Sequence, residues 1–236
     1  MHAYFYDTKK ELPADFGDYL VVSDTAVVEL DMCRGHLDEG PDVTCPCPRG
    51  REIIDPINRF NNEARKLGIP VIHVHVVNRK GGIDDVRGNK AAWRRVFPMT
   101  VGPIPNADMH NIEGTKWCEF VVDINEEDLT VDTKKRLTAF YPTDLEFLLR
   151  NLKKNTIVIT GLMTDCCVLS TSFDGSNRGF NILVPRDLTR GFNPQMEDAA
   201  LRIISLHLGL VVDSQELISR WKEESVLGYG NRQMKD

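Results

Sequence analysis

Short apolar runs alternate with helical segments along most of this chain. The apolar runs predict buried strands at residues 25–31, 71–77, 120–122, 156–160, 181–184 and 210–213. Helical periodicity and helix-start signals predict helices at residues 51–67, 143–152 and 194–207, after residue 167 and from residue 215. This alternation predicts an α/β fold of three layers, with helices on both faces of a mostly parallel central sheet. Ligands bind such sheets beyond the carboxyl ends of the strands, so candidate chemistry should lie there.

The 236 residues are enough for one α/β domain with a sizeable core, so we expect a single domain over residues 1–236. A polar amino-terminal arm, residues 1–24, precedes the first strand. A long irregular stretch at about residues 78–115 is rich in glycine, proline, arginine and asparagine. Loops of that length are usually functional, which predicts a lid or a subunit contact. Thr143, with Glu146 three positions later, predicts a capping box for the helix that follows.

Composition narrows the possible partners. The formal net charge of -6 and the pI of about 5.6 argue against nucleic acid or an anionic membrane as a partner. The amino terminus lacks the basic and apolar regions of a secretory signal, and no window is apolar over the length that spans a bilayer. Six cysteines without a secretion signal indicate reduced thiols. We therefore expect a cytoplasmic protein that acts on a small molecule.

The segment from Gly161 to Val168 joins a predicted strand to a predicted helix, and it contains two adjacent cysteines. At such a junction a cysteine meets the positive end of a helix dipole and unpaired backbone N–H groups. Both favour a thiolate and an oxyanion over their neutral forms. Cys166 and Cys167 are therefore candidate nucleophiles.

A thiol with a pKa of about 8.5 is mostly protonated at neutral pH, so a cysteine nucleophile usually has a base or a cation beside it. Asp31, at the end of the first strand, is a candidate base, although this position also suits a turn cap. Glu29 lies on the same predicted face one pleat deeper, and a buried carboxylate there would need a partner. A lysine within residues 133–140 could hold Asp31 ionised and stabilise a substrate oxyanion, although Lys-Lys-Arg runs are most often solvated.

Several motifs follow one another in order from about residue 25 to residue 217. They are an apolar strand ending in Asp31; Lys134 with Arg136, Ala139-Phe140 and Thr143-Asp144-Leu145; Gly161-x-x-Thr164-Asp165-x-Cys167-Val168; and Asp174-x-x-x-Arg178-Gly179. In this order and at this spacing the chain resembles the isochorismatase-like cysteine hydrolase superfamily. Members of that superfamily include nicotinamidases, ureidoacrylate amidohydrolase, carbamoylsarcosine amidohydrolase and biuret hydrolase.

The resemblance implies the isochorismatase-like hydrolase fold and a catalytic triad of Asp31, Lys134 and Cys167. The family's register selects Lys134 over Lys135, and Cys167 over Cys166. It implies a cysteine-dependent amidohydrolase that cleaves a C–N bond through a thioester and releases ammonia or an amine. Many relatives form dimers or tetramers, so we expect a homodimer or homotetramer.

The resemblance also implies an oxyanion hole made by the backbone N–H groups of Met163 and Cys167. In the family, a cis peptide before the nucleophile directs one of these groups inward. Here that peptide would join Leu162 to Met163.

A candidate substrate-binding set follows from the resemblance and from the polar residues near the expected site. Its members are His36, Glu29, Asp38, Trp93 and His207. His36 stands where many relatives have an aromatic residue. A small polar pocket of this kind points to biuret, triuret, guanylurea or N-carbamoyl compounds, and an acidic lining would suit guanylurea because it is a cation.

We expect neither a metal nor another cofactor. Nicotinamidases carry a zinc site with an Asp-x-His element after the second strand, and residues 78–82 have no such element, which argues against nicotinamide as the substrate. His73 and His75 are better explained as core or pocket-wall residues than as ligands. Cys45 and Cys47 resemble half of a metal site, with no second ligand pair at a suitable spacing.

Three alternatives stay open. A flavodoxin-type binding module would explain the alternating elements but not the three candidate catalytic positions, and the chain lacks a phosphate loop. A thiol redox protein could use Cys166 with Cys167, or Cys45 with Cys47, but neither pair has the usual Cys-x-x-Cys spacing. A nicotinamidase-like hydrolase is the third.

Overall fold

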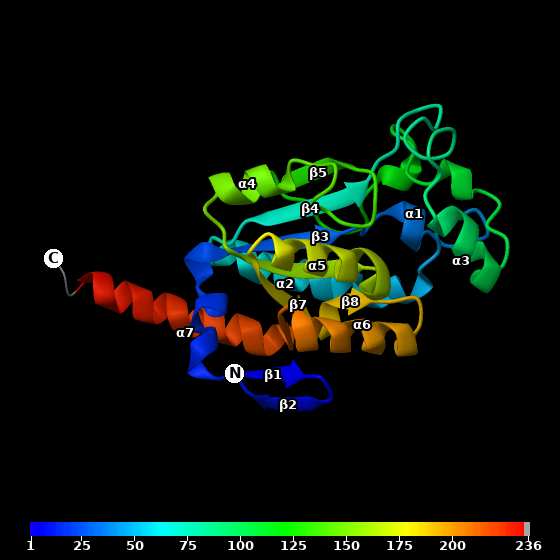
Figure 1. Cartoon of the computed structure of the whole chain (residues 1–236). Coiled ribbons are helices and arrows are strands. Elements are labelled where there is room, and N and C mark those ends of the chain that lie inside the picture. The colour runs from blue at the N-terminus through cyan, green and yellow to red at the C-terminus, as the bar shows by residue number, and fades with distance from the viewer. Residues whose placement is uncertain (234–236) are drawn as a thin grey trace.

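One sheet runs through the structure, with helices on both sides (Figure 1). The computed structural model describes residues 1–233, and their side chains as far as residue 226. Within these residues the sheet has nine strands in the order β2-β1-β9-β7-β6-β3-β4-β5, with β8 paired to β6. The strands from β9 to β5 in this order are mutually parallel, as is β8. The expected α/β fold with a mostly parallel sheet is therefore confirmed.

The strands are β1 (His2–Phe5), β2 (Thr8–Glu11), β3 (Thr25–Leu30), β4 (Val71–Val76), β5 (Leu129–Lys134), β6 (Thr156–Leu162), β7 (Asn181–Pro185), β8 (Thr189–Arg190) and β9 (Leu210–Val212). The α-helices are α1 (Arg34–Leu37), α2 (Ile54–Lys66), α3 (Trp93–Val101), α4 (Leu145–Asn151), α5 (Leu169–Asn177), α6 (Pro194–His207) and α7 (Ser214–Gln233). Short 3-10 helices span Ala14–Leu20, Val22–Asp24, Pro48–Ile53, Ala107–Met109, Lys116–Cys118 and Arg186–Leu188, and a π-helical turn spans Thr164–Val168.

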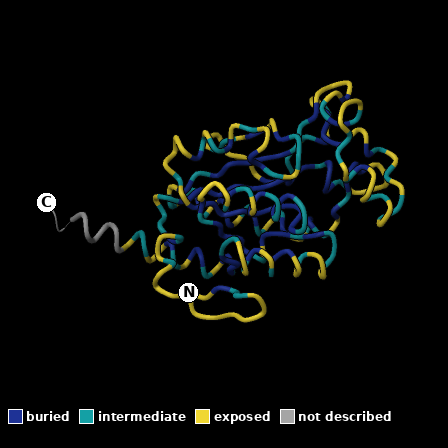
Figure 2. The backbone as a smooth tube through the Cα atoms, in the orientation of Figure 1, coloured by how far each residue is buried: buried dark blue, intermediate teal, exposed yellow. Residues whose placement is uncertain are grey.

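Alternate residues of the central strands pack into two cores, one on each face of the sheet. Val27 of β3 belongs to the core that holds Phe60 of α2 and Trp221 of α7. Its neighbour Val28 belongs to the other core, with Leu149 of α4 and residues of α5 and α6. Figure 2 shows the resulting buried centre between exposed outer layers. The period of two along each strand thus explains why helices are needed on both faces.

The amino-terminal arm begins with a β-hairpin that extends the sheet. Strand β1 pairs antiparallel with β2 and, at Tyr4, with β9. Every residue of β2 is exposed, so its sequence lacks the apolar alternation that predicts a strand.

Two other expectations need correction. Residues 120–122 form no strand: Phe120 makes only a single bridge to Cys33, and the next strand of the sheet is β5. The capping box before α4 is also absent, because the Thr143 hydroxyl accepts the N–H of Leu145 (3.2 Å) while Glu146 pairs with arginines. The helix therefore starts at Leu145.

Residues 78–115 are more ordered than a loop, since they contain α3 and a 3-10 turn. In the described part of the chain, no helix combines the length and the apolar character needed to cross a membrane.

Candidate active site

Asp31 directly follows β3 and is completely buried. Its φ of +57° turns the chain away from the strand direction. Its backbone N–H donates to the carbonyl of Val74 (2.8 Å), and its Oδ1 accepts the N–H of Val76 (3.1 Å). The end of β4 therefore fixes the carboxylate in place and satisfies one of its oxygens.

Lys134 is the last residue of β5, and its side chain is fully buried. Its Nζ donates to Oδ2 of Asp31 (2.6 Å) and to Sγ of Cys167 (3.3 Å). Lys135 points elsewhere, to the carbonyl of Val77 and to Asp84. The lysine between the carboxylate and the thiol is thus Lys134.

Cys167 lies on the π-helical turn between β6 and α5 and is buried, whereas Cys166 is partly exposed. The Cys167 thiol donates weakly to the sulfur of Cys166 at 4.0 Å. Because Lys134 hydrogen-bonds to Cys167, the structure brings this cysteine, rather than its neighbour, into one cluster with Asp31.

Gly161 allows β6 to approach β3 closely enough to form this cluster. Its φ is +95°, and a Cβ at this position would lie 2.1 Å from the carbonyl oxygen of Leu30. Both the backbone conformation and the contact therefore require glycine.

We expect Gly161→Ala to lower the free energy of unfolding by more than about 3 kcal/mol, since left-handed strain of about 1–3 kcal/mol adds to a backbone clash. Urea denaturation of the purified variant measures this. Gly17→Ala is the control, because a methyl group there would meet nothing within 4 Å. Similar small losses in both variants would show that the contact between β3 and β6 relaxes easily.

Asp31, Lys134 and Cys167 shift one another's pKa values. Burial would raise the pKa of Asp31, but the charge of Lys134 holds that pKa below its ordinary value. Burial would likewise lower the pKa of Lys134, and Asp31 raises it instead. The contact with Cys166, burial and the charge of Asp31 raise the pKa of Cys167 well above that of an ordinary thiol. At neutral pH the resting cluster is therefore a carboxylate, an ammonium and a thiol.

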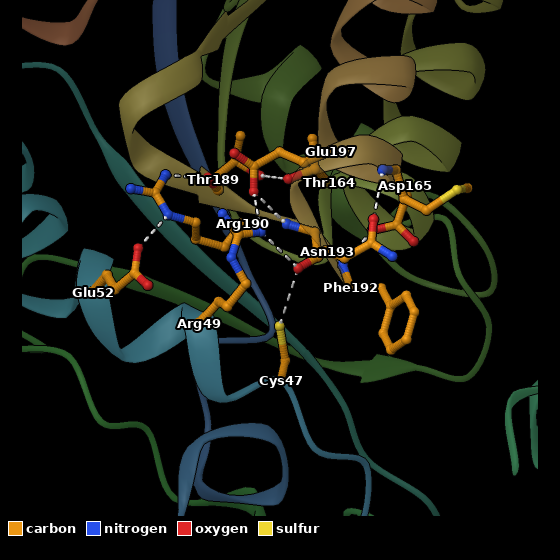
Figure 3. A network of polar contacts seen from close by, with 12 residues as sticks. Cys47, Arg49, Glu52, Thr164, Asp165, Thr189, Arg190, Phe192, Asn193 and Glu197 are labelled. Atoms are coloured by element: carbon orange, nitrogen blue, oxygen red, sulfur yellow. Dashed lines mark hydrogen bonds and ion pairs between the residues drawn. The ribbon is translucent and has the colours of Figure 1, made fainter. Parts of the chain in front are cut away.

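Polar contacts anchor the turn that carries Cys167 (Figure 3). Oδ1 of Asp165 accepts the N–H of Phe192 (2.8 Å). The hydroxyls of Thr164 and Thr189 are 2.8 Å apart, and that of Thr189 donates to the carbonyl of Gly161 (2.9 Å). The turn is thus tied both to β8 and to the segment before α6.

A second set of contacts in Figure 3 joins the 3-10 helix Pro48–Ile53 to the start of α6. Arg49 donates to Oε2 of Glu197 (2.7 Å), and the same oxygen accepts the N–H of Gly191 (3.0 Å). The support of the turn that carries Cys167 therefore extends across three segments that are distant in sequence.

The cluster opens into a cavity of about 750 Å³. Cys167, Cys166 and Met163 line its inner end, and Trp93 and Phe97 of α3 contribute aromatic surface. The segment expected to be a lid or a subunit contact therefore supplies a wall of the same chain's cavity. Polar side chains on the remaining wall are His36, Asn78, Asp85, Asn89, Lys90, Thr100, His110, Lys135, Arg136 and Asp165.

Residues 25–216 match the isochorismatase domain. The chain belongs to the isochorismatase family. It is 38% identical to ureidoacrylate amidohydrolase RutB of Methylorubrum extorquens over 200 residues, which cover 80% of this chain and 79% of the relative. It is 29% identical to N-carbamoylsarcosine amidase of an Arthrobacter species over 164 residues. That match covers 69% of this chain but only 58% of the relative.

Solved structures of the isochorismatase family share the fold. A cysteine hydrolase from Pseudomonas syringae superposes with a TM-score of 0.75 at 23% identity, covering 87% of this chain and 96% of that one. Nicotinamidase PncA from Bacillus subtilis superposes with a TM-score of 0.65 at 26% identity, covering 80% and 99%. The expected resemblance and the expected isochorismatase-like fold are both confirmed.

Within this family fold, only two of the five expected substrate-binding residues reach the cavity. His36 and Trp93 line it. Oε2 of Glu29 instead forms a hydrogen bond with Nδ1 of the buried His73 (2.9 Å). Asp38 forms an ion pair with Arg34 at the surface. His207, the last residue of α6, is exposed and lies off the cavity wall. The structure therefore does not bring Glu29, Asp38 and His207 to the cavity wall, where the sequence-based expectation had put them.

The peptide between Leu162 and Met163 is trans, contrary to the expectation from the resemblance. In residues 1–233 the cis bond is that of Tyr141–Pro142. Met163 has an extended backbone, with φ −88° and ψ 144°, and the left-handed conformation of Gly161 makes the turn just before it. Met163 still lines the cavity beside Cys167, so the oxyanion hole remains a proposal.

His110 and Asp85 line the cavity, but no sequence pattern indicates this, because both residues lie in the long segment without strand or helix periodicity. The spacing of Cys45 and Cys47 suggests a pair, but the structure separates them: Cys45 lines the cavity and Cys47 faces the carbonyl of Gly191. Asp165 was recognised as part of a motif, and it both anchors the turn and lines the cavity.

Proposed function

We propose that this chain is a cysteine-dependent amidohydrolase that cleaves a C–N bond of a small polar amide or ureide. The observation that carries the proposal is the position of Lys134, whose Nζ contacts both the buried Asp31 carboxylate and the thiol of Cys167, which lines the cavity. A buried base, a cation and a nucleophile in direct contact are the requirements of acyl transfer. A flavodoxin-type binding module needs none of them.

In the first half of the reaction, Cys167 attacks the substrate carbonyl and its proton passes to Asp31. Lys134 stabilises the negative charge that develops, together with the backbone N–H groups of Met163 and Cys167. Asp31 then gives the proton to the leaving nitrogen, the C–N bond breaks, and ammonia or an amine departs. Cys167 is left as a thioester.

In the second half, a water molecule attacks the thioester carbonyl and Asp31 takes one of its protons. The C–S bond breaks, Asp31 returns the proton to the Cys167 sulfur, and the acid leaves the cavity. The lowered pKa of Asp31 keeps the carboxylate ready for both proton abstractions at neutral pH.

Ureides and N-carbamoyl compounds are the substrate class that we propose. Two relatives are named for a ureidoacrylate and an N-carbamoyl amino acid. The cavity also offers many polar groups that could bind a ureide, but its acidic residues Asp85 and Asp165 are balanced by Lys90, Lys135 and Arg136, so guanylurea has no electrostatic advantage over neutral ureides. We further propose a homodimer or homotetramer as the working assembly, which light scattering after size-exclusion chromatography tests.

Ammonia release from the purified protein tests the proposed class. The panel contains biuret, triuret, guanylurea, a ureidoacrylate analogue, N-carbamoyl amino acids and nicotinamide. We expect turnover of a ureide or N-carbamoyl compound, and its loss in Cys167→Ser. Turnover of nicotinamide alone would replace the ureide proposal with a nicotinamidase, and no ammonia from any substrate would contradict the proposed class.

A further inference from the structure

Three side chains with metal-binding chemistry meet on one wall of the catalytic cavity. His36, Cys45 and His110 each offer one potential ligand atom, and these atoms all lie within 4.8 Å of one another. All three residues are buried and all three line the cavity. His36 and Cys45 come from the segment after β3, and His110 comes from the long segment between β4 and β5.

The hydrogen bonds of the two imidazoles fix which nitrogen is free. Nδ1 of His36 lies 2.8 Å from the carbonyl of Cys45, so this nitrogen carries the hydrogen. The hydroxyl of Thr44 donates to the carbonyl of Gly35 (3.0 Å) and must therefore accept from Nδ1 of His110 (2.9 Å). Nε2 of both rings is then an unprotonated acceptor, and it has no hydrogen-bond partner among the described residues.

This arrangement is the one that metal-binding histidines use. Their second ring N–H is usually held by a carbonyl or another oxygen, which sets the tautomer and the ring orientation.

The ring geometry fits a shared ion. The centroids of the His36 and His110 rings are 4.7 Å apart at an interplanar angle of 67°. Two imidazoles bound to one tetrahedral zinc through Nε2, with Zn–N of about 2.1 Å, have centroids about 5 Å apart. The ligand atoms would need to close by about 1 Å around the ion to reach zinc distances, which side-chain rotation can supply.

Nearby charge does not oppose a cation. Lys134 and Arg94 are each paired with a buried carboxylate, Asp31 and Asp85 respectively. Of the basic residues on the cavity wall, Lys90 pairs with Asp108 and Lys135 with Asp84. When an ion binds, the Cys45 thiol loses its proton to solvent, and the thiolate neutralises one of the two charges of the ion.

We propose that His36, Cys45 and His110 bind one transition-metal ion of the zinc class, with its fourth position open to the catalytic cavity. Three protein ligands and one open position are typical of a catalytic rather than a structural zinc site. The ion would hold an oxygen or nitrogen of the substrate while Cys167 attacks. The ligands differ from the Asp-x-His element sought in the sequence, so the expectation of no metal would be overturned.

Cobalt binding tests the site without any substrate. Wild-type protein is stripped with a chelator, titrated with Co²⁺ and followed by its sulfur-to-cobalt charge-transfer absorption, and the zinc content of untreated protein is measured by mass spectrometry. We expect one ion per chain, with loss of the charge-transfer band in Cys45→Ala and at least tenfold weaker binding in His110→Ala. Thermal unfolding checks that both variants are folded.

Two matched variants identify the cysteine that produces the charge-transfer band. Cys47→Ala removes a buried cysteine that lies off the cavity, and Cys167→Ala removes the nucleophile; both should keep the band and the stoichiometry. If the charge-transfer band were lost in Cys167→Ala but kept in Cys45→Ala, the ion would be bound by Cys167 instead of Cys45, and the proposed site would be overturned. Absence of cobalt binding, with a raised KM in His36→Ala and His110→Ala, would also overturn it and show that the imidazoles bind substrate directly.

Discussion

Cys167→Ser should lower kcat/KM by at least about a thousandfold while leaving the protein folded and able to bind substrate. Serine keeps the shape of the side chain, but its hydroxyl is a far weaker acid than a thiol. Its oxygen is also a poorer nucleophile and, as an alkoxide, a poorer leaving group than a thiolate sulfur, so both acyl transfer to the enzyme and release of the acid slow down. Ammonia release with the best substrate of the panel gives the rate, and calorimetric titration gives the affinity.

Cys166→Ser is the matched control, because Cys166 is adjacent, also lines the cavity and makes no hydrogen bond to Lys134 in the described structure. We expect its kcat/KM to stay within about tenfold of wild type, a loss of no more than about 1.4 kcal/mol of transition-state stabilisation. If Cys166→Ser were the inactive variant and Cys167→Ser the active one, the assignment of the nucleophile would be reversed.

The parallel core and the position of Asp31 were predictable because they rest on local pattern. The strands β3, β4, β6 and β7 are buried on both faces, so they appear in the sequence as continuous apolar runs. The apolar pattern does not predict strand β5, because β5 is an edge strand in which apolar and polar residues alternate only weakly. It contains the polar residues Thr130, Asp132 and Thr133. Lys134 was therefore located by family resemblance, not by its place at the end of a strand.

The substrate-binding residues were less predictable because they depend on tertiary geometry. The period of two put Glu29 on the same side as Asp31, but that period ends at Leu30, since Asp31 has a positive φ. Glu29 stays in the core against His73, while Asp31 turns toward β4 and Lys134. His110 approaches His36 only because the chain between β4 and β5 folds back over the site, which no local pattern records.

Lys134→Met should lower kcat/KM by about a hundredfold or more and reverse the way stability depends on pH. In wild type the folded-state pKa of Asp31 is lowered, so its contribution to stability is present above the ordinary pKa and is lost as pH falls through the folded-state value. Without the ammonium, burial dominates and raises that pKa above its unfolded value. The variant should then gain stability as pH falls, and its free energy of unfolding at pH 8 should be lower than that of wild type by about 3 kcal/mol.

Urea denaturation from pH 4 to pH 8, together with the pH profile of kcat/KM, measures both effects. Because Asp31 must be ionised to accept the Cys167 proton, the acid limb of the profile should move to higher pH in Lys134→Met. Lys135→Met is the control, since Lys135 is partly exposed and contacts Val77 and Asp84 instead of Asp31. An unchanged acid limb in Lys134→Met would mean that Asp31 is not the base, whereas equal shifts in both variants would mean that the charge acts at long range and that the direct contact is not required.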